Sequence, residues 1–452
     1  MAQLHLLGIA GSFMAGIARL AAADGHHIAG SDAAFYPPFG DEVKKLNCPL
    51  YQGYDADCHD RPADLYIIGN AISRGNPLLE SILRHRRPFI SAPQWLYENV
   101  LRNKHVLAVA GTHGKTTTSA LLTYLLTQAG LAPGFLVGGM LPNFSCSAQL
   151  AVDSDFFVIE ADEYDSAFFD KRPKFLHYHP RTAILNNLEF DHADIYPDVA
   201  AIVRQFHYLL RSVPDNGRII AAANEPHLAA AVAMGCYTPI EYFGNESNEN
   251  AGGDWHWRYA NEKMQVWRGQ EQCGEPFPPP LAGKANRNNV LAAIVAAAAV
   301  GVDVNRCGEY LQGFVPPLRR LQLLAENKGI RLLDDFAHHP TAISETIAAL
   351  AEQGRGRLIA VFEPRSNTMK AGVFRTQWQQ TFRQADYVVA VGDQPWLPQT
   401  LANCHPHLQI ADTVAAAEAL ICPLLRADDT VVLMSNGDFG GLAARLAAFV
   451  NS

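Results

Sequence analysis

The sequence has little of three things: paired cysteines, positive charge and long apolar runs. Its eight cysteines are scattered and include no C-x-x-C pair, which argues against a zinc ribbon or a disulfide scaffold and favours a reducing compartment. The 36 Lys and Arg residues are outnumbered by 45 Asp and Glu residues, so no basic field would attract nucleic acid or an anionic membrane.

No segment of the sequence predicts membrane insertion. The apolar run Val290–Val302 is shorter than the ~20 residues that a membrane span needs, and we interpret it as a buried helix. The first residues, MAQLHLLGIAGSF, have no basic region and no cleavage site of small residues. We therefore expect a cytoplasmic protein that is not exported.

The alternation of strand-like and helix-like patterns predicts an α/β fold with parallel sheets. HVLAVAGT, for example, is followed by the helical pattern TTTSALLTYLLTQAG. At roughly 100–200 residues per domain, 452 residues suggest about three domains. We place them at residues 1–103, 104–315 and 316–452, and predict a peripheral β-meander or insertion at Gly244–Pro280, where NESNENAGG and PFPPP interrupt the rhythm.

The strongest functional signal is GTHGKTTT, residues 111–118, between a predicted strand and a predicted helix. Its glycines let backbone N–H groups converge on a phosphate, Lys115 can neutralise phosphate oxygens, and Thr116 can offer a hydroxyl to Mg²⁺. Val109 stands where the general phosphate-loop consensus has its first glycine. The alternative is a helix cap with a chance lysine.

Two later strand ends carry acidic residues. SDFFVIEADEYD ends in Glu160, Asp162, Glu163 and Asp165, and TAILNN runs into LEFDHADIY with Glu189, Asp191, His192 and Asp194. Carboxylates at the carboxyl end of a strand can hold Mg²⁺ beside a nucleotide, and His192 could be a further ligand. Solvated acidic loops and a surface histidine remain the alternatives.

The N-terminal glycines Gly8, Gly11 and Gly16 lie between a predicted strand and helix, and Asp32 ends the next strand. The turn could approach a diphosphate while Asp32 accepts hydrogen bonds from a nucleoside. The spacing is not G-x-G-x-x-G, because Ala10 and Phe13 occupy the other glycine positions, so a tight strand-to-helix turn is the alternative.

Three C-terminal loops also follow predicted strands: DDFAHHP, EPRSNTMK and MSNGDFGGL. We expect them to face one crevice, although loops are commonly polar without binding anything. Arg365 could read the carboxylates of a peptide through its planar fork, with Ser366 and Asn367 as neutral donors. A contact with a neighbouring carboxylate or with ATP is the alternative for Arg365.

Over nearly its whole length the chain resembles the Mur ligase family of peptidoglycan metabolism. The segments that carry the resemblance are GTHGKTTT, EADEYD, NNLEFDHADIY, GKANRNNV, Leu318–Leu321 and DDFAHHP. The resemblance implies an N-terminal UDP-binding domain, a central ATPase domain and a C-terminal domain for the incoming amine. It also implies ATP and Mg²⁺ as cofactors, and an acyl-phosphate mechanism.

The resemblance implies five sets of site residues. The catalytic residues would be Lys115, Glu160 and His192, and the metal ligands Thr116, Glu160 and His192. ATP would be bound by Gly111, Thr112, His113, Gly114, Lys115, Thr116, Thr117, Asn286, Asn289, Arg320 and Asp335. The UDP-substrate would be bound by Gly11, Ser12, Phe13, Met14, Asp32, Asn70 and Ser73, and the peptide by Arg365, Ser366, Asn367 and His338.

Two positions depart from the family pattern. Ala285 stands where members often have histidine, which puts one adenine contact in doubt, and His207 stands where several members carry a carbamoylated lysine. Arg204 is the other basic residue between that position and the metal histidine. We therefore expect a magnesium site without a lysine carbamate, as in members that act on bare UDP-N-acetylmuramate.

Within the family, ISRGNP, FFDKRPKF, DDFAHHPTAI and EPRSNTMK are most similar to members that attach the tripeptide L-alanyl-γ-D-glutamyl-meso-diaminopimelate to UDP-N-acetylmuramate. Members that add L-alanine to the same acceptor are the alternative. A phosphate-loop kinase or ATPase would not need the N-terminal turn or a third domain. A non-catalytic relative would be expected to lack Lys115, Glu160 or His192.

Overall fold

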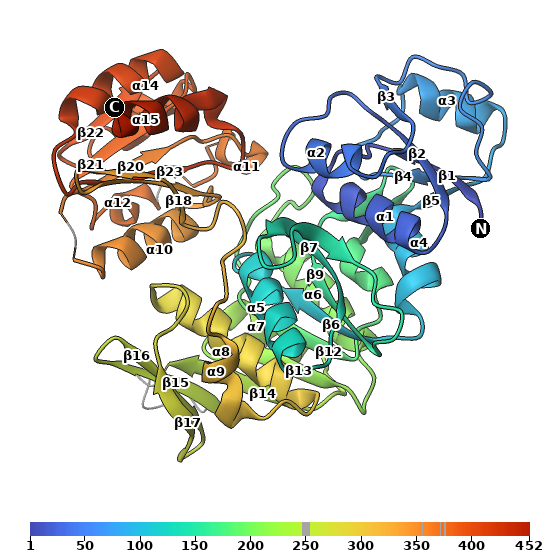
Figure 1. The fold of residues 1–452 in the computed structure, drawn as a ribbon, viewed down its shortest axis with the longest axis horizontal. Helices are drawn as coiled ribbons and strands as arrows, with labels where there is room; N and C mark the ends of the chain where they lie inside the picture. The colour runs from blue at the N-terminus through green and yellow to red at the C-terminus, as the bar shows by residue number, and fades with distance from the viewer. Residues whose placement is uncertain (246–253, 355, 371, 375–376) are drawn as a thin grey trace. The chain divides into compact units, whose positions relative to one another are not determined.

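The computed structural model describes residues 1–245, 254–354, 356–370, 372–374 and 377–452 (Figure 1). Contacts between Cα atoms divide the chain into two compact units. Unit 1 comprises Met1–Phe190, Asp198–Pro278 and Asn288–Val315, and unit 2 comprises Asp191–Pro197, Pro279–Arg287 and Pro316–Ser452.

Unit 1 begins with a five-stranded parallel sheet in the spatial order β3-β2-β1-β4-β5. Parallel neighbours need crossover connections, and helices supply several of them. Asn76 starts one such helix by accepting the Leu79 backbone N–H at 3.1 Å. The strands are β1 (Gln3–Leu7), β2 (His27–Asp32), β3 (Leu50–Gln52), β4 (Leu65–Ile68) and β5 (Phe89–Ser91). The helices are α1 (Ser12–Ala23), α2 (Phe39–Lys44), α3 (Pro77–Arg84), α4 (Ala92–Leu96) and the π-helix η1 (Tyr97–Leu101).

The second sheet of unit 1 has ten strands in the order β17-β16-β15-β14-β13-β12-β6-β9-β7-β8. Its central strands are parallel, and antiparallel pairs form both edges. The strands are β6 (His105–Ala110), β7 (Gly134–Leu141), β8 (Cys146–Gln149), β9 (Phe156–Ala161), β12 (Thr182–Leu185), β13 (Arg218–Ala222), β14 (Ile240–Asn245), β15 (Trp255–Ala260), β16 (Lys263–Arg268) and β17 (Glu271–Phe277). A separate antiparallel pair is formed by β10 (Asp165–Ala167) and β11 (Asp170–Pro173).

Three long helices, α5, α6 and α8, and several short ones accompany this sheet. They are α5 (Lys115–Gln128), α6 (Val199–Ser212), α7 (Pro226–Ala233), α8 (Lys284–Ala299), α9 (Cys307–Tyr310) and the 3-10 helices η2 (Lys174–His177) and η3 (Val304–Arg306). Buried polar contacts join the sheet to the N-terminal one. The Glu42 carboxylate accepts the Ser147 N–H at 2.8 Å and its hydroxyl at 2.7 Å, and Arg19 donates to the Ala148 carbonyl.

Unit 2 contains a six-stranded sheet in the order β18-β19-β23-β20-β21-β22, parallel except for the β18–β19 pair. The strands are β18 (Gln322–Asn327), β19 (Ile330–Asp335), β20 (Leu358–Phe362), β21 (Tyr387–Val391), β22 (Leu408–Ala411) and β23 (Thr430–Met434). The helices are α10 (Pro340–Ala351), α11 (Asn367–Lys370), α12 (Trp378–Thr381), α13 (Trp396–Leu401), α14 (Val414–Ile421), α15 (Leu442–Asn451) and the 3-10 helices η4 (Cys422–Leu424) and η5 (Phe439–Gly441).

Alternate residues of this sheet enter two separate apolar cores. Ala360 and Phe362 of β20 pack in one core, and Ile359 and Val361 pack in the other. Side chains of a strand point to opposite faces with a period of two, so the continuous apolar run of β20 reflects a strand buried on both sides.

The predicted α/β class with parallel sheets is confirmed. Val290–Ala297 is buried within α8, and in the described residues no helix is long and apolar enough to cross a membrane. The region Gly244–Pro280 contains the antiparallel strands β15 to β17, while residues 246–253 of the NESNENAGG run lie outside the described part. Of the two predicted alternatives, the peripheral β-meander is confirmed, because these strands follow one another at one edge of the ten-stranded sheet.

The boundaries at 103 and 315 stay predictions. The division into two units coincides with the second, but two segments inside residues 104–315 belong to unit 2: Asp191–Pro197 and Pro279–Arg287.

Candidate functional site

The phosphate-loop segment connects β6 to α5, and its glycines have backbone conformations that other residues rarely adopt. Gly111 has a φ of +143° and Gly114 a φ of +79°. A Cβ at Gly114 would collide with the side-chain oxygen of Asn289. Val109 is a fully buried strand residue paired with Glu160 and Ile184, so this loop turns without the first consensus glycine.

Lys115 is the first residue of α5, and its ammonium is held inside unit 1. Nζ donates to the Gly111 carbonyl at 2.8 Å and to Glu163 Oε2 at 2.9 Å, and lies 3.7 Å from Asp162 Oδ1. Burial alone would lower the pKa of Lys115, but the neighbouring carboxylates of Glu163, Asp162 and Glu160 raise it above its ordinary value. Lys115 is therefore a fixed cation at neutral pH.

Glu160 and Thr116 place two oxygen ligands beside this cation. The Thr116 hydroxyl donates to Glu160 Oε2 at 3.1 Å, and the same oxygen accepts the Gly138 N–H at 2.8 Å. A Cβ at Gly138 would lie 2.9 Å from the Glu160 carboxylate, so glycine permits the close approach. A hydroxyl and a carboxylate are hard ligands, and these two residues therefore fit Mg²⁺.

The segment after β12 holds the phosphate loop from the other side. Asn187 Oδ1 accepts the His113 N–H at 2.7 Å, and its amide donates to the His113 carbonyl at 3.2 Å. The Glu189 N–H donates to the Thr112 hydroxyl at 2.8 Å, and Glu189 Oε2 lies 3.3 Å from His113 Nε2. These contacts fix the backbone of the loop where it would meet phosphate.

A buried polar network links α5 to α8. Thr118 Oγ1 donates to Asn289 Oδ1 at 3.2 Å, and Asn186 Nδ2 donates to Thr118 Oγ1 at 3.0 Å. Asn289 is thereby placed against the helix that follows the phosphate loop. Asn286, three residues earlier on α8 and within unit 2, donates to the Ala282 carbonyl at 2.8 Å.

The N-terminal turn is held by Asp32, whose carboxylate accepts the Ala10 N–H at 2.8 Å. Gly8 has a φ of +82°, and Gly11 precedes α1 in an extended conformation. The predicted nucleoside-binding residue therefore also shapes the turn. Ser12 and Phe13 are partly buried and Gly11 is exposed, whereas the Met14 side chain lies in the core and leaves only its backbone available.

Asn70 and Ser73 follow β4, the strand next to β1, at the same carboxyl edge of the sheet. Asn70 is partly buried and Ser73 is exposed. The carboxyl edge of a parallel sheet is where ligands bind in such folds, so their position agrees with the predicted role without testing it.

Lys174, which the sequence did not single out, lies between the N-terminal turn and the acidic strand end. Its Nζ donates to Asp162 Oδ2 at 3.0 Å and lies 5.4 Å from the centroid of the Phe13 ring. The side chain is buried. Asp162 thus contacts both Lys174 and Lys115, and it connects the two predicted substrate sites of unit 1.

In unit 2, Asp335 organises the end of β19. Its carboxylate accepts the N–H groups of Leu321 and Ala337 at 2.8 and 2.9 Å. Burial raises the pKa of Asp335 above its usual range, although the Arg320 charge opposes that shift. Arg320 also lies over the Phe336 ring, at 5.2 Å from its centroid.

The DHAD segment lies with the histidine loop of unit 2. Asp191 Oδ1 accepts the Thr368 hydroxyl at 3.0 Å and the His192 N–H at 2.7 Å. Burial would raise the pKa of Asp191, but the charges of His192, His338 and His339 lower it to about 2. Glu189 is assigned to unit 1, and Asp191, His192 and Asp194 are assigned to unit 2. The predicted grouping of these four residues stays a prediction.

Arg365 is half-exposed and forms an ion pair. Its Nη1 donates to Asp438 Oδ1 at 3.0 Å, and it packs closely against Gly437. Ser366 accepts the Met369 N–H, while Asn367 begins α11 and its side chain lies outside the described part. His338 Nδ1 contacts the Phe336 carbonyl at 2.9 Å.

Comparisons with known proteins agree with this arrangement of loops and sheets. The chain matches three family models: "Mur ligase family, catalytic domain" at residues 3–104, "Mur ligase middle domain" at 109–297, and "Mur ligase, glutamate ligase domain" at 319–437. It is also 45% identical over 452 residues to the UDP-N-acetylmuramate–L-alanyl-γ-D-glutamyl-meso-2,6-diaminoheptandioate ligase of Escherichia coli K12, covering 98% of this chain and 97% of the relative. The chain belongs to the Mur ligase family.

This Mur ligase also resembles a solved structure along its whole length. The murein peptide ligase of Psychrobacter arcticus is 37% identical, with a TM-score of 0.77 and coverage of 100% of this chain and 99% of that one. A UDP-N-acetylmuramate–L-alanine ligase of Roseiflexus is 30% identical over 463 residues and covers 96% of both chains. The predicted family, the α/β fold with three Mur ligase domains and the ATP-dependent ligase class are confirmed.

The sequence missed several residues that complete the site of this Mur ligase. Asn186 and Asn187 stood in the quoted run TAILNN, and their position directly after a strand was the signal that could have found them. Gly138 and Lys174 gave no such signal, since each reaches Glu160 or Asp162 only through the tertiary fold. The individual roles of all predicted site residues stay predictions.

Proposed function

We propose that this Mur ligase uses ATP and Mg²⁺ in the cytoplasm to join L-alanyl-γ-D-glutamyl-meso-diaminopimelate to UDP-N-acetylmuramate. The observation that carries the proposal is the full-length identity of 45% to a ligase named for these two substrates. Identity to the L-alanine-adding relative is 30% over a similar share of the chain. The reaction would return a released cell-wall peptide to the nucleotide-linked precursor.

In the proposed reaction, a carboxylate oxygen of UDP-N-acetylmuramate attacks the γ-phosphorus of ATP. The bond from that phosphorus to the β–γ bridging oxygen breaks, and ADP leaves. The peptide's amine then attacks the acyl carbon, loses a proton, and displaces phosphate. Such a sequence asks the protein mainly for positioning and charge, and the supporting feature is a phosphate loop beside fixed charges.

The residues of unit 1 would supply that positioning. The N–H groups at the start of α5 would face phosphate oxygens, and the Lys115 ammonium would neutralise their charge. Thr116 and Glu160 would hold Mg²⁺, which would neutralise charge on the phosphates. The resemblance also assigns His192 to the metal, and Asn286, Asn289, Arg320 and Asp335 to ATP.

Lys115 supports this proposal because protein groups alone hold its charged ammonium in place. Its contacts with Glu163 and the Gly111 carbonyl hold Nζ over the loop. A phosphate would add a further anionic partner to an ammonium whose position is already fixed. Little reorganisation would then be needed in the transition state.

For the incoming peptide, Arg365 is the residue proposed to bind a carboxylate. Its Nη1 is paired with Asp438, and the half-exposed guanidinium has further donors for a ligand. A peptide ending in diaminopimelate offers carboxylates that match the planar fork. Single alanine would leave most of a three-residue site without partners.

The test is a side-by-side assay with UDP-N-acetylmuramate, ATP and Mg²⁺, in which the amine is either the tripeptide or L-alanine. We expect phosphate release to need both the UDP-sugar acid and the amine, and kcat/KM to be far higher for the tripeptide. Carboxylate labelled with ¹⁸O should transfer one label to the released phosphate. A higher kcat/KM for L-alanine would move the chain to the alanine-adding members, and unlabelled phosphate would exclude the acyl phosphate.

A further inference from the structure

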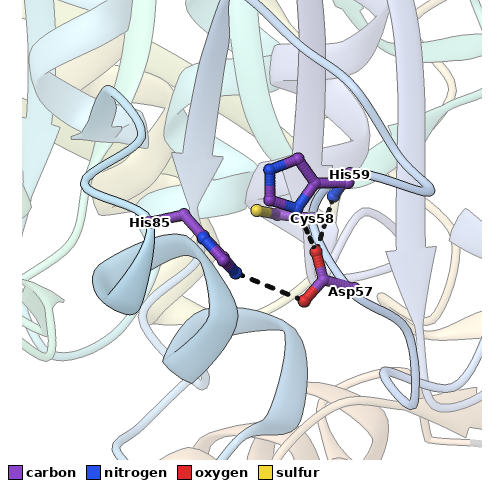
Figure 2. A group of neighbouring side chains, drawn as sticks. All are labelled: Asp57, Cys58, His59 and His85. Carbon is purple, nitrogen blue, oxygen red and sulfur yellow. Dashed lines mark hydrogen bonds and ion pairs between the residues drawn. The ribbon is translucent and has the colours of Figure 1, made fainter.

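Four potential metal ligands gather in the N-terminal part of unit 1, and none of them is among the predicted site residues of the ligase. Asp57, Cys58 and His59 lie on the loop after β3, and His85 follows α3 (Figure 2). One ligand atom from each lies within 4.8 Å of the others. His59 Nδ1 lies 2.5 Å from Asp57 Oδ1, and His85 Nε2 lies 3.5 Å from Asp57 Oδ2.

The surrounding hydrogen bonds hold this group in place. Ser81, a buried residue of α3, donates from Oγ to Asp57 Oδ2 at 2.9 Å and accepts the Cys58 N–H at 3.0 Å. The Tyr66 hydroxyl donates to the Cys58 carbonyl at 3.0 Å. Outer partners of this kind orient metal ligands and fix their geometry.

The two imidazoles also approach each other closely. The ring centroids of His59 and His85 lie 4.3 Å apart, with the rings nearly perpendicular. Both rings are solvent-accessible, whereas the Cys58 residue is only 1% exposed, so the group has an open side and a buried thiol beneath it. A metal ion could enter from solvent and meet the thiol last.

We propose that Asp57, Cys58, His59 and His85 form a binding site for a zinc-class transition metal. Two nitrogens, one sulfur and one carboxylate oxygen make a four-ligand set of the kind that Zn²⁺ accepts in tetrahedral geometry. Mg²⁺ needs hard oxygen ligands and would not suit it. On binding, the metal takes the thiolate of Cys58, and the thiol proton passes to solvent.

Such a metal would join the loop after β3 to the end of α3. In its absence those elements are connected at this place by the Ser81 hydrogen bonds and by the ion pairs of Asp57 with two exposed histidines. Exposed ion pairs contribute little to stability. The metal should therefore stabilise unit 1 without taking part in the ligase reaction.

The test uses the reduced, chelator-treated full-length protein with Co²⁺ as a spectroscopic probe and excess Mg²⁺ to occupy oxygen-ligand sites. We expect one Co²⁺ per chain, with a sulfur-to-cobalt charge-transfer band and the visible bands of tetrahedral cobalt, both displaced by Zn²⁺. His59→Gln and His85→Gln should each weaken Co²⁺ binding by at least about tenfold. Cys58→Ser should remove the charge-transfer band.

The matched control is His27→Gln, which replaces another exposed histidine of the same sheet region and should leave both spectrum and affinity unchanged. Because Cys58 is buried, Cys58→Ser could fail to fold, and the two exposed histidine variants then carry the test. Absence of the charge-transfer band in the wild type would overturn the proposal. So would a band that persists with unchanged affinity in both histidine variants.

Discussion

The phosphate loop and the Arg365 loop differ in how completely the protein itself holds them. Lys115 is held by two direct partners, and the loop before it is pinned by Asn187 and Glu189. Arg365 has one described ion pair, with the exposed Asp438. The protein's own contacts hold the first region, whereas the described contacts of the second leave Arg365 half-exposed with one ion pair. Preorganised charge should therefore affect turnover, and Arg365 should affect substrate affinity.

The largest effect is expected from Lys115→Ala. Loss of the fixed cation should lower kcat for ATP-dependent ligation by about 10²–10³-fold, because one electrostatic contact to the transition state is removed. The variant should still fold, but its melting temperature should fall, because the buried Glu163 carboxylate loses its cation. The measurement is steady-state kinetics together with thermal unfolding.

The matched control for that change is Lys171→Ala, which removes a mostly exposed lysine paired with Asp165. Its kcat should stay within about twofold of wild type, since surface ion pairs contribute little. Near-normal ligation by Lys115→Ala would contradict the assignment of the loop to ATP.

Acid should destabilise unit 1 through His5, which is buried in β1 of the five-stranded sheet. Burial, and secondarily the Arg61 charge, lower the pKa of His5 to about 4 from 6.5. Between these two pH values the unfolded chain binds more protons at His5 than the folded chain does. The free energy of unfolding is therefore highest above pH 6.5 and falls as the pH is lowered toward 4. His5 alone should lower the free energy of unfolding by about 3 kcal/mol when the pH falls from 6.5 to 4.

The measurement is the free energy of unfolding by urea from pH 7 to pH 4, for wild type and His5→Gln. The variant should show a shallower fall over that range. Parallel curves for the two proteins would mean that His5 does not cause the dependence.

A smaller effect is expected from Gly114→Ala, which tests the backbone of the phosphate loop. A side chain at a φ of +79° costs about 1–2 kcal/mol, and the new Cβ would also collide with Asn289. ATP affinity, measured by calorimetry, should fall by about tenfold or more.

Gly130→Ala is the matched control, because Gly130 has a φ of +84° but no atom within 4 Å of an added Cβ. Backbone strain should lower its stability in thermal unfolding by a similar amount, and its ATP affinity should stay normal. Equal ATP affinities for the two variants would show that the close approach at Gly114 does not matter.

The smallest effect is expected from Arg365→Ala. The KM for tripeptide should rise about tenfold while the KM for ATP stays unchanged, because a half-exposed guanidinium provides a solvent-weakened contact to a carboxylate. Arg445→Ala removes an exposed arginine paired with Glu418 in the same unit and should change neither constant. A fall in kcat with an unchanged tripeptide KM would instead place Arg365 with the reacting phosphates.

Much of the fold could be predicted because it depends on local patterns. The run HVLAVA predicted a buried strand, and the following GTHGK predicted a turn before a helix, which the structure has as β6 and α5. The order of strands in the sheets could not be predicted in the same way. β6 lies between β9 and β12 in the sheet. That order depends on how the crossover connections pack against the sheet, and not on the local sequence of β6.

The candidate site was predicted unevenly for the same reason. Lys115 and Thr116 follow the end of β6, and Glu160 lies near the carboxyl end of β9, where an α/β fold gathers polar residues. The structure places Thr116 against Glu160. The pairing of Lys115 with Glu163 rather than Glu160 was not predictable, since four acidic residues of one short segment are equivalent in sequence.

By itself, the sequence determined the alternation of strands and helices, the glycine turn that can admit a phosphate, and the likeness to the Mur ligases, because these depend on residues close together in the chain. Only the tertiary structure decided which groups hold that turn. Asn187 and His113 are 74 residues apart yet share two hydrogen bonds, and Lys174 meets Phe13 across an even longer separation. Such contacts arise from the packing of buried elements, and periodicity along the chain carries no record of them.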